Sequence, residues 1–103
     1  MFATVRRYEG IDSSNIDELT KKVGESLAPK LSKLPGFSSY FLIDTGNGVM
    51  TSIGLFDTPS QGVDSTRIAS EWIRNEKLES VLPNAPKVTD GEVIVHKTNG
   101  VRA

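Results

Sequence analysis

The chain contains no cysteine, and this absence removes several kinds of chemistry. Without a thiol there is no disulfide, thiolate nucleophile or zinc–thiolate site. Histidine occurs once, as His96, and no tight group of acidic residues accompanies it in the sequence. No serine stands in a G-x-S-x-G elbow, the motif that presents a nucleophile to its base. We therefore expect neither a metal site nor a nucleophilic triad.

An excess of charge of either sign is also missing. The 12 Lys and Arg against 13 Asp and Glu give a net charge of −1, and the longest basic cluster is a pair. This balance disfavours binding to nucleic acid or to anionic membranes. No apolar run approaches the roughly 20 residues that span a bilayer, and the N-terminal residues lack the order of a secretory signal. The simplest expectation is a soluble cytoplasmic protein.

The 103 residues, 37% of them hydrophobic, are enough for one domain. We expect a single domain over 1–103, with a core over about 2–97 and a tail over 98–103. The tail has no clear pattern and is expected either to be disordered or to lie across a partner.

The first half of the chain predicts a strand over 2–8 and then a helix. Ser14-x-x-Asp17 is typical of a capping box at the helix start, and Pro35-Gly36 ends the helical pattern. Pro29 interrupts it and is expected to kink or restart the helix. The apolar stripe recurs at three- and four-residue steps through Ile16, Leu19, Val23, Leu27, Leu31 and Leu34.

Two further strands are expected at about 37–44 and 49–56, and the Asn-Gly pair between them is typical of a tight hairpin turn. Neither face of this hairpin alternates cleanly with polar residues, as a face open to water should. We expect helices to cover one face and a second copy of the chain to cover the other.

The second half predicts a helix and a last strand. Thr58-Pro59-x-Gln61 has a Thr cap, a first-turn Pro and a third-position Gln, and the helix is expected to end near Asn75. An irregular proline-containing connector then leads to a strand over 92–97. The order is therefore β-α-β-β-α-β, an α+β class with a ferredoxin-like four-stranded antiparallel sheet.

Four residues are candidates for a pocket: Arg6, Tyr40, Trp72 and His96. His96 is a candidate because imidazole is the side chain whose unperturbed charge change falls near neutral pH, although a half-exposed histidine at a strand end is the more ordinary interpretation. Trp72 lies on the apolar face of the second helix, in the core or lining a pocket. A buried Tyr40 would need a polar partner.

Arg6 lies within the first strand and could hold a carboxylate or an oxyanion if it lies beneath a pocket. A solvated position at the sheet edge is equally compatible with the sequence. The Asp57-Thr58 and Asp64-Ser65 pairs are interpreted as helix-start residues, without a catalytic role.

The strand and helix order, the Leu-Pro-Gly-Phe step at 34–37 and the tryptophan at position 72 resemble the dimeric α/β-barrel superfamily. The resemblance covers about residues 2–97 and is strongest to small antibiotic-biosynthesis-monooxygenase-like domains; residues 82–93 are similar to uncharacterised members. It implies a ferredoxin-like protomer that dimerises through its sheet face.

Some members of that superfamily are cofactor-independent oxygenases of phenols, whereas others degrade haem or have no known activity. Haem-degrading members resemble one another through an Asn on the first strand and a Trp and a His on the second helix. Trp72 alone matches that set here. The resemblance thus implies a cofactor-independent monooxygenase of a small aromatic or enolisable substrate, with no cofactor. A non-catalytic homodimer that binds a small apolar ligand or takes part in stress responses is the alternative.

Overall fold

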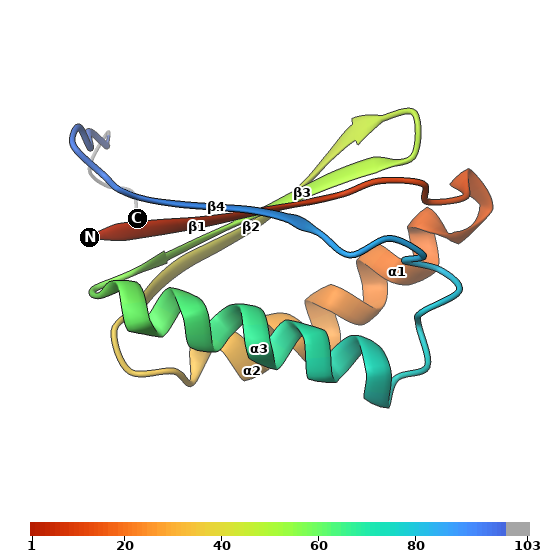
Figure 1. Cartoon of the computed structure of the whole chain (residues 1–103), viewed down its shortest axis with the longest axis horizontal. Coiled ribbons are helices and arrows are strands. Elements are labelled where there is room, and N and C mark those ends of the chain that lie inside the picture. The colour runs from red at the N-terminus through yellow and green to blue at the C-terminus, as the bar shows by residue number, and fades with distance from the viewer. Residues whose placement is uncertain (99–103) are drawn as a thin grey trace.

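A computed structural model describes residues 1–98. Its elements run in the order β-α-β-β-α-β, with the first helical arm divided into short segments (Figure 1). The strands are β1 (Phe2–Tyr8), β2 (Phe37–Gly46), β3 (Val49–Phe56) and β4 (Lys87–Glu92). The helical segments are a 3-10 turn (Ser13–Asn15), α1 (Ile16–Lys22), a π-helical stretch (Val23–Leu27), α2 (Ala28–Ser32) and α3 (Pro59–Asn75).

The four strands form one antiparallel sheet in the order β2-β3-β1-β4. All helices lie against one face of this sheet (Figure 1). This is the ferredoxin-like α+β architecture predicted from the sequence, and the prediction is confirmed. The predicted tail falls largely on 99–103, outside the described residues.

The hairpin between β2 and β3 follows its predicted turn chemistry. Asn47 and Gly48 take φ of 58° and 75°, the positive values that a two-residue hairpin loop of this type requires. Asn is one of the few residues with a side chain that tolerates this region, which explains the Asn-Gly pair.

The first helical arm bends around its proline as expected. The helix widens into a π turn over Val23–Leu27 and resumes as α2, with Pro29 in its first turn. Proline is tolerated in the first turn of a helix, where an N–H would have no partner within the helix. Further inside a regular helix its ring would clash with the preceding turn. The apolar stripe nevertheless stays in the core, since Leu19, Leu27 and Leu31 are all buried.

The two long helical arms begin with different caps, and only one of them is the predicted cap. At α3 the capping box is present, and the Thr58 N–H donates to Gln61 Oε1 at 3.0 Å. The capping box predicted at Ser14 and Asp17 is wrong. Asp12 instead accepts from the backbone N–H of Ser14 at 2.9 Å and so closes a 3-10 turn before α1 begins.

The predicted position of the last strand is also wrong. The strand over 92–97 was expected from its apolar residues, yet β4 covers Lys87–Glu92 and is exposed throughout. Ile94 and Val95, beyond its end, are 87% and 83% exposed. Backbone pairing with β1 fixes this edge strand, so its side chains need no buried partners.

The face of the sheet without helices carries exposed apolar side chains on β2, beside polar residues such as Arg7 and Thr51. Phe41 and Ile43 on β2 are 51% and 42% exposed. Their cross-strand neighbours place Ile53 and Val5 on the same face. As predicted, this face of the hairpin is not cleanly polar, and its coverage by a second copy of the chain stays a prediction.

Candidate functional site

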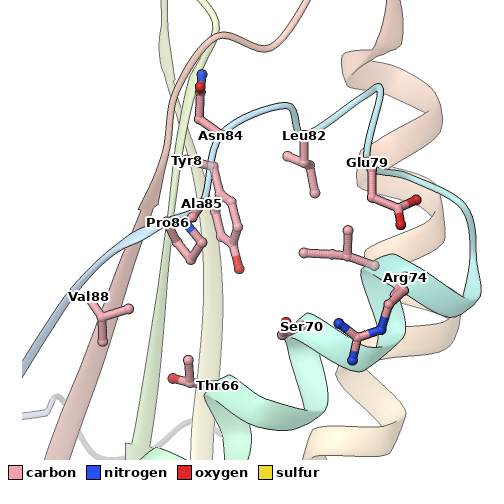
Figure 2. Close-up of a pocket in the computed structure, with 11 residues that line it drawn as sticks. Tyr8, Thr66, Ser70, Arg74, Glu79, Leu82, Asn84, Ala85, Pro86 and Val88 are labelled. Carbon is pink, nitrogen blue, oxygen red and sulfur yellow. The ribbon is translucent and has the colours of Figure 1, made fainter.

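A pocket of about 380 Å³ opens between β1, β4, α3 and the connector that joins α3 to β4 (Figure 2). Its volume lies within the usual range for small-molecule sites, about 300–1,000 Å³. The lining residues are Tyr8, Thr66, Ser70, Ile73, Arg74, Glu79, Leu82, Asn84, Ala85, Pro86 and Val88. Apolar side chains therefore form much of the wall, and hydroxyl groups interrupt it.

Figure 2 shows how the polar groups are distributed around this pocket. Tyr8 extends from β1 with its hydroxyl toward α3, where Thr66 and Ser70 lie. Arg74 extends from α3 with its guanidinium toward Ser70, whereas Glu79 lies apart from it, next to the connector. The hydroxyls of Tyr8, Thr66 and Ser70 thus share the pocket with one cationic side chain, Arg74, and one carboxylate, Glu79.

Arg6 lies behind the hydroxyl end of the pocket. Its side chain is only 1% exposed. Its Nη1 donates to Ser65 Oγ at 3.1 Å and to Thr66 Oγ1 at 3.2 Å. Thr66 also lines the pocket, so a single side chain separates the guanidinium from the cavity.

The strand alternation of β1 explains why this arginine is inside. Thr4, Arg6 and Tyr8 share the face toward the helices. Arg7 points to the opposite face and forms an exposed ion pair with Glu9 at 2.8 Å. Because successive side chains of a strand alternate between faces, neighbouring arginines occupy contrasting environments.

Arg6 has no acidic partner within residues 1–98, where none of the ion pairs involves it. Its Nε is buried without a hydrogen-bond partner, as is Ser52 Oγ on the facing position of β3. Buried charges are normally paired, because desolvation of an ion is costly. Within the described residues, this guanidinium thus has hydroxyl partners but no acidic partner.

The two tyrosines near Arg6 remain protonated at neutral pH. Burial raises the pKa of Tyr8 above its ordinary value, and the nearby Arg6 charge opposes only part of that rise. The pKa of Tyr40 is raised for the same reason, again against the effect of Arg6. Both phenols therefore act as hydrogen-bonding O–H groups and not as bases.

Three of the four residues predicted as a pocket lie near one another, whereas His96 does not lie with them. Arg6 and Tyr40 lie near each other, as the effect of Arg6 on the Tyr40 pKa indicates. None of the four lines the 380 Å³ pocket directly. His96 is exposed beyond the end of β4, on the segment whose strand was predicted wrongly.

Trp72 belongs to the core. It is 3% exposed, and its Nε1 donates to Ser26 Oγ at 2.9 Å. It lines a pocket of about 290 Å³ with Glu76, and together with Tyr40 it borders a void of about 20 Å³ between the helices and the sheet. Tyr8, Ile73 and Leu82 line both the 20 Å³ void and the 380 Å³ pocket, so they lie between Trp72 and a ligand in the 380 Å³ pocket.

Sequence reasoning missed Ser65 and Thr66. The Asp64-Ser65 pair was interpreted as a helix start, but it lies inside α3. Ser65 Oγ donates to the Gly62 carbonyl at 2.7 Å, which leaves its oxygen free to accept from Arg6. In the sequence, Ser65 and Thr66 are only an adjacent pair of hydroxyl residues in a predicted helix. They indicate a site only once the fold places the buried Arg6 opposite them.

Residues 1–98 contain neither a membrane-spanning helix nor a cluster of metal ligands. No helix there is long and apolar enough to cross a membrane. No group of three or more His, Asp or Glu side chains lies close enough to hold a metal ion within that range.

Comparisons with known proteins place the fold in a defined group. No family model matches the chain, and no curated protein matches it. Among solved structures, a MhuD variant with two manganese protoporphyrin IX molecules per active site has a TM-score of 0.74 at 15% identity, over 96% of this chain and 100% of that one.

Two other solved structures share the fold. A monooxygenase of Streptomyces coelicolor in complex with nanaomycin D matches with a TM-score of 0.67 and 14% identity, over 94% of this chain and 92% of that one. A dimeric ferredoxin-like protein from an uncultured marine organism matches with a TM-score of 0.67 and 13% identity, over 95% and 98%. The chain therefore has the fold of antibiotic-biosynthesis-monooxygenase-like structures.

Proposed function

We propose that the chain is a small-molecule enzyme of the oxygenase type, which acts without a cofactor on a small aromatic or enolisable substrate in the pocket between β1 and α3. The observation that carries this proposal is the buried Arg6 guanidinium behind an apolar pocket, without an acidic partner in residues 1–98. A structural neighbour with a bound ligand is a monooxygenase, which supports the class of reaction.

The reaction requires few catalytic groups from the protein. An electron-rich phenol reacts with O₂ so that one oxygen atom becomes a ring carbonyl and the other leaves as water, with the substrate itself supplying the electrons. The anionic form of the phenol is the electron donor, and a nearby fixed positive charge stabilises that form. Arg6 supplies this charge, and the apolar walls exclude water from the ring.

A haem-degrading role has less support in this chain, although one structural neighbour binds a manganese porphyrin. β1 contains no Asn and α3 contains no His. The pocket also offers no histidine, the usual axial ligand of a haem iron in enzymes of many kinds.

The alternative is a dimeric binding protein that holds the same kind of ligand without turnover. Both versions place a second copy of the chain on the apolar face of the sheet, where Phe41 and Ile43 are exposed. A dimeric neighbour of the same fold supports this assembly.

Oxygen consumption with a panel of mono- and polycyclic phenols tests the enzyme version. We expect uptake with at least one phenol, a loss of at least tenfold for Arg6→Met, as expected when a hydrogen-bonded charge is removed, and no change for His96→Ala. The histidine variant is a suitable control because His96 is exposed and remote from the pocket lining. Saturable phenol binding without oxygen uptake would favour the alternative.

A further inference from the structure

The charges around the pocket are unequal in a way that restricts its ligand. Arg6 is positive at all ordinary pH values, is 1% exposed and has no ion pair within residues 1–98. Hydroxyl dipoles from Ser65 and Thr66 are its hydrogen-bond partners. A guanidinium in such a place is stabilised most by an anion in the adjacent pocket.

Hydroxyl groups lie between the Arg6 charge and the cavity. Thr66 accepts from Arg6 and lines the pocket, and Tyr8 lines the same pocket beside it. A guanidinium has donors only, so an oxygen that faces it acts as the acceptor. The O–H protons of Tyr8 and Thr66 are then free to donate into the pocket, polarised by the cation behind them.

Within residues 1–98, no carboxylate or imidazole of the pocket lining lies beside these hydroxyls. The carboxylate in the lining, Glu79, lies beside the connector, away from Tyr8 and Thr66 (Figure 2). On β4, Asp90 faces Thr4 and not Arg6, and it is exposed and forms no ion pair in the described part of the chain. On β1 and β2, burial keeps the phenols of Tyr8 and Tyr40 protonated by raising the pKa of each.

We propose that the pocket takes its ligand as an oxyanion already ionised in solution, held by the hydroxyls of Tyr8 and Thr66 in front of Arg6. The ligand class is a small planar phenolate, enolate or aromatic carboxylate. This inference rests on the proposed function only for the location of the site. It adds that the protein binds a ligand that is already ionised and does not itself deprotonate it.

Calorimetric titration under argon with three probes tests the proposal without turnover. 4-Nitrobenzoate is ionised throughout the neutral range, 4-nitrophenol ionises within it, and 4-nitroanisole has no ionisable group. We expect 4-nitrobenzoate to bind with little dependence on pH, 4-nitrophenol to bind more tightly as it ionises, and 4-nitroanisole to bind at least tenfold more weakly than the anions.

The visible absorbance of bound 4-nitrophenol gives a second readout. A tenfold preference for the anion lowers the ionisation midpoint of the bound phenol by about one pH unit. A merely structural role of Arg6 would not move this midpoint. The expected shift is lost in Arg6→Met.

Tyr8→Phe and Tyr40→Phe form a matched pair. Both remove a phenol O–H near Arg6, but Tyr8 lines the pocket and Tyr40 does not. We expect Tyr8→Phe to weaken 4-nitrobenzoate binding about tenfold or more, as expected for a hydrogen bond to a charged group, and Tyr40→Phe to change it little.

Three results would overturn the proposal: 4-nitroanisole binding as tightly as the anions, equal losses in the two tyrosine variants, or no binding of any probe at millimolar concentration. Anion binding with no oxygen uptake from any phenol would instead leave this inference intact and remove the proposed oxygenase activity.

Discussion

At the scale of the residue, one side chain determines the character of the site. Arg6 is placed inside by the alternation of β1, and its hydrogen bonds go to hydroxyls of α3. The sequence could show an arginine in a strand, but not which face it takes or what lies opposite. Those depend on register and on α3, whose Ser65 and Thr66 are 59 and 60 positions away in the chain.

The buried tyrosines predict how stability depends on alkaline pH. A phenol whose pKa is raised by folding contributes stability that is fully present below the unfolded value, about 10, and lost as pH rises through the folded value. Urea unfolding across this range should show the free energy of unfolding falling with pH. The fall should be smaller in the double variant Tyr8→Phe/Tyr40→Phe. A free energy of unfolding that rises over the same range would contradict this assignment.

At the scale of the element, close packing of α3 on β1 positions the hydroxyls against Arg6. Gly62 allows this approach, because a Cβ there would collide with Thr4 Oγ1. The sequence predicted α3, its cap and its end, since these depend on local residues. It misplaced β4, because an exposed edge strand is fixed by backbone pairing, which leaves no hydrophobic pattern to recognise.

We expect Gly62→Ala to lower the free energy of unfolding by about 1–3 kcal/mol, the usual cost of overpacking. Gly24→Ala is the matched control, because a Cβ at that helical glycine meets nothing within 4 Å. It should leave stability unchanged or raise it by up to about 1 kcal/mol. Chemical denaturation of both variants makes the comparison, and equal effects would show that α3 can move away from β1 without cost.

At the scale of the whole molecule, helices cover one face of the sheet (Figure 1). The other face exposes the apolar side chains of Phe41 and Ile43. The sequence predicted apolar side chains on the open face, because neither face of the hairpin alternates cleanly with polar residues, as a face open to water should. It could not predict the pocket, which is formed where β1, α3 and a connector meet.

Light scattering should give the mass of two chains for the wild type. Phe41→Glu should shift it toward one chain, since a buried carboxylate without a partner is costly. Val63→Glu is the control: Val63 is 62% exposed and belongs to α3, on the helical side of the sheet. A wild type that is monomeric at micromolar concentration would contradict the sheet-face dimer.

The central claim is that Arg6 serves a ligand and not the fold. Thermal unfolding of the wild type and of Arg6→Met, each with and without 4-nitrobenzoate, tests it most directly. We predict that the ligand raises the melting temperature of the wild type only, because binding to the native state stabilises it. Without ligand the variant should melt no lower, since it removes a buried charge that has no acidic partner within residues 1–98. A variant that melts well below the wild type yet keeps the full ligand-induced shift would contradict the account.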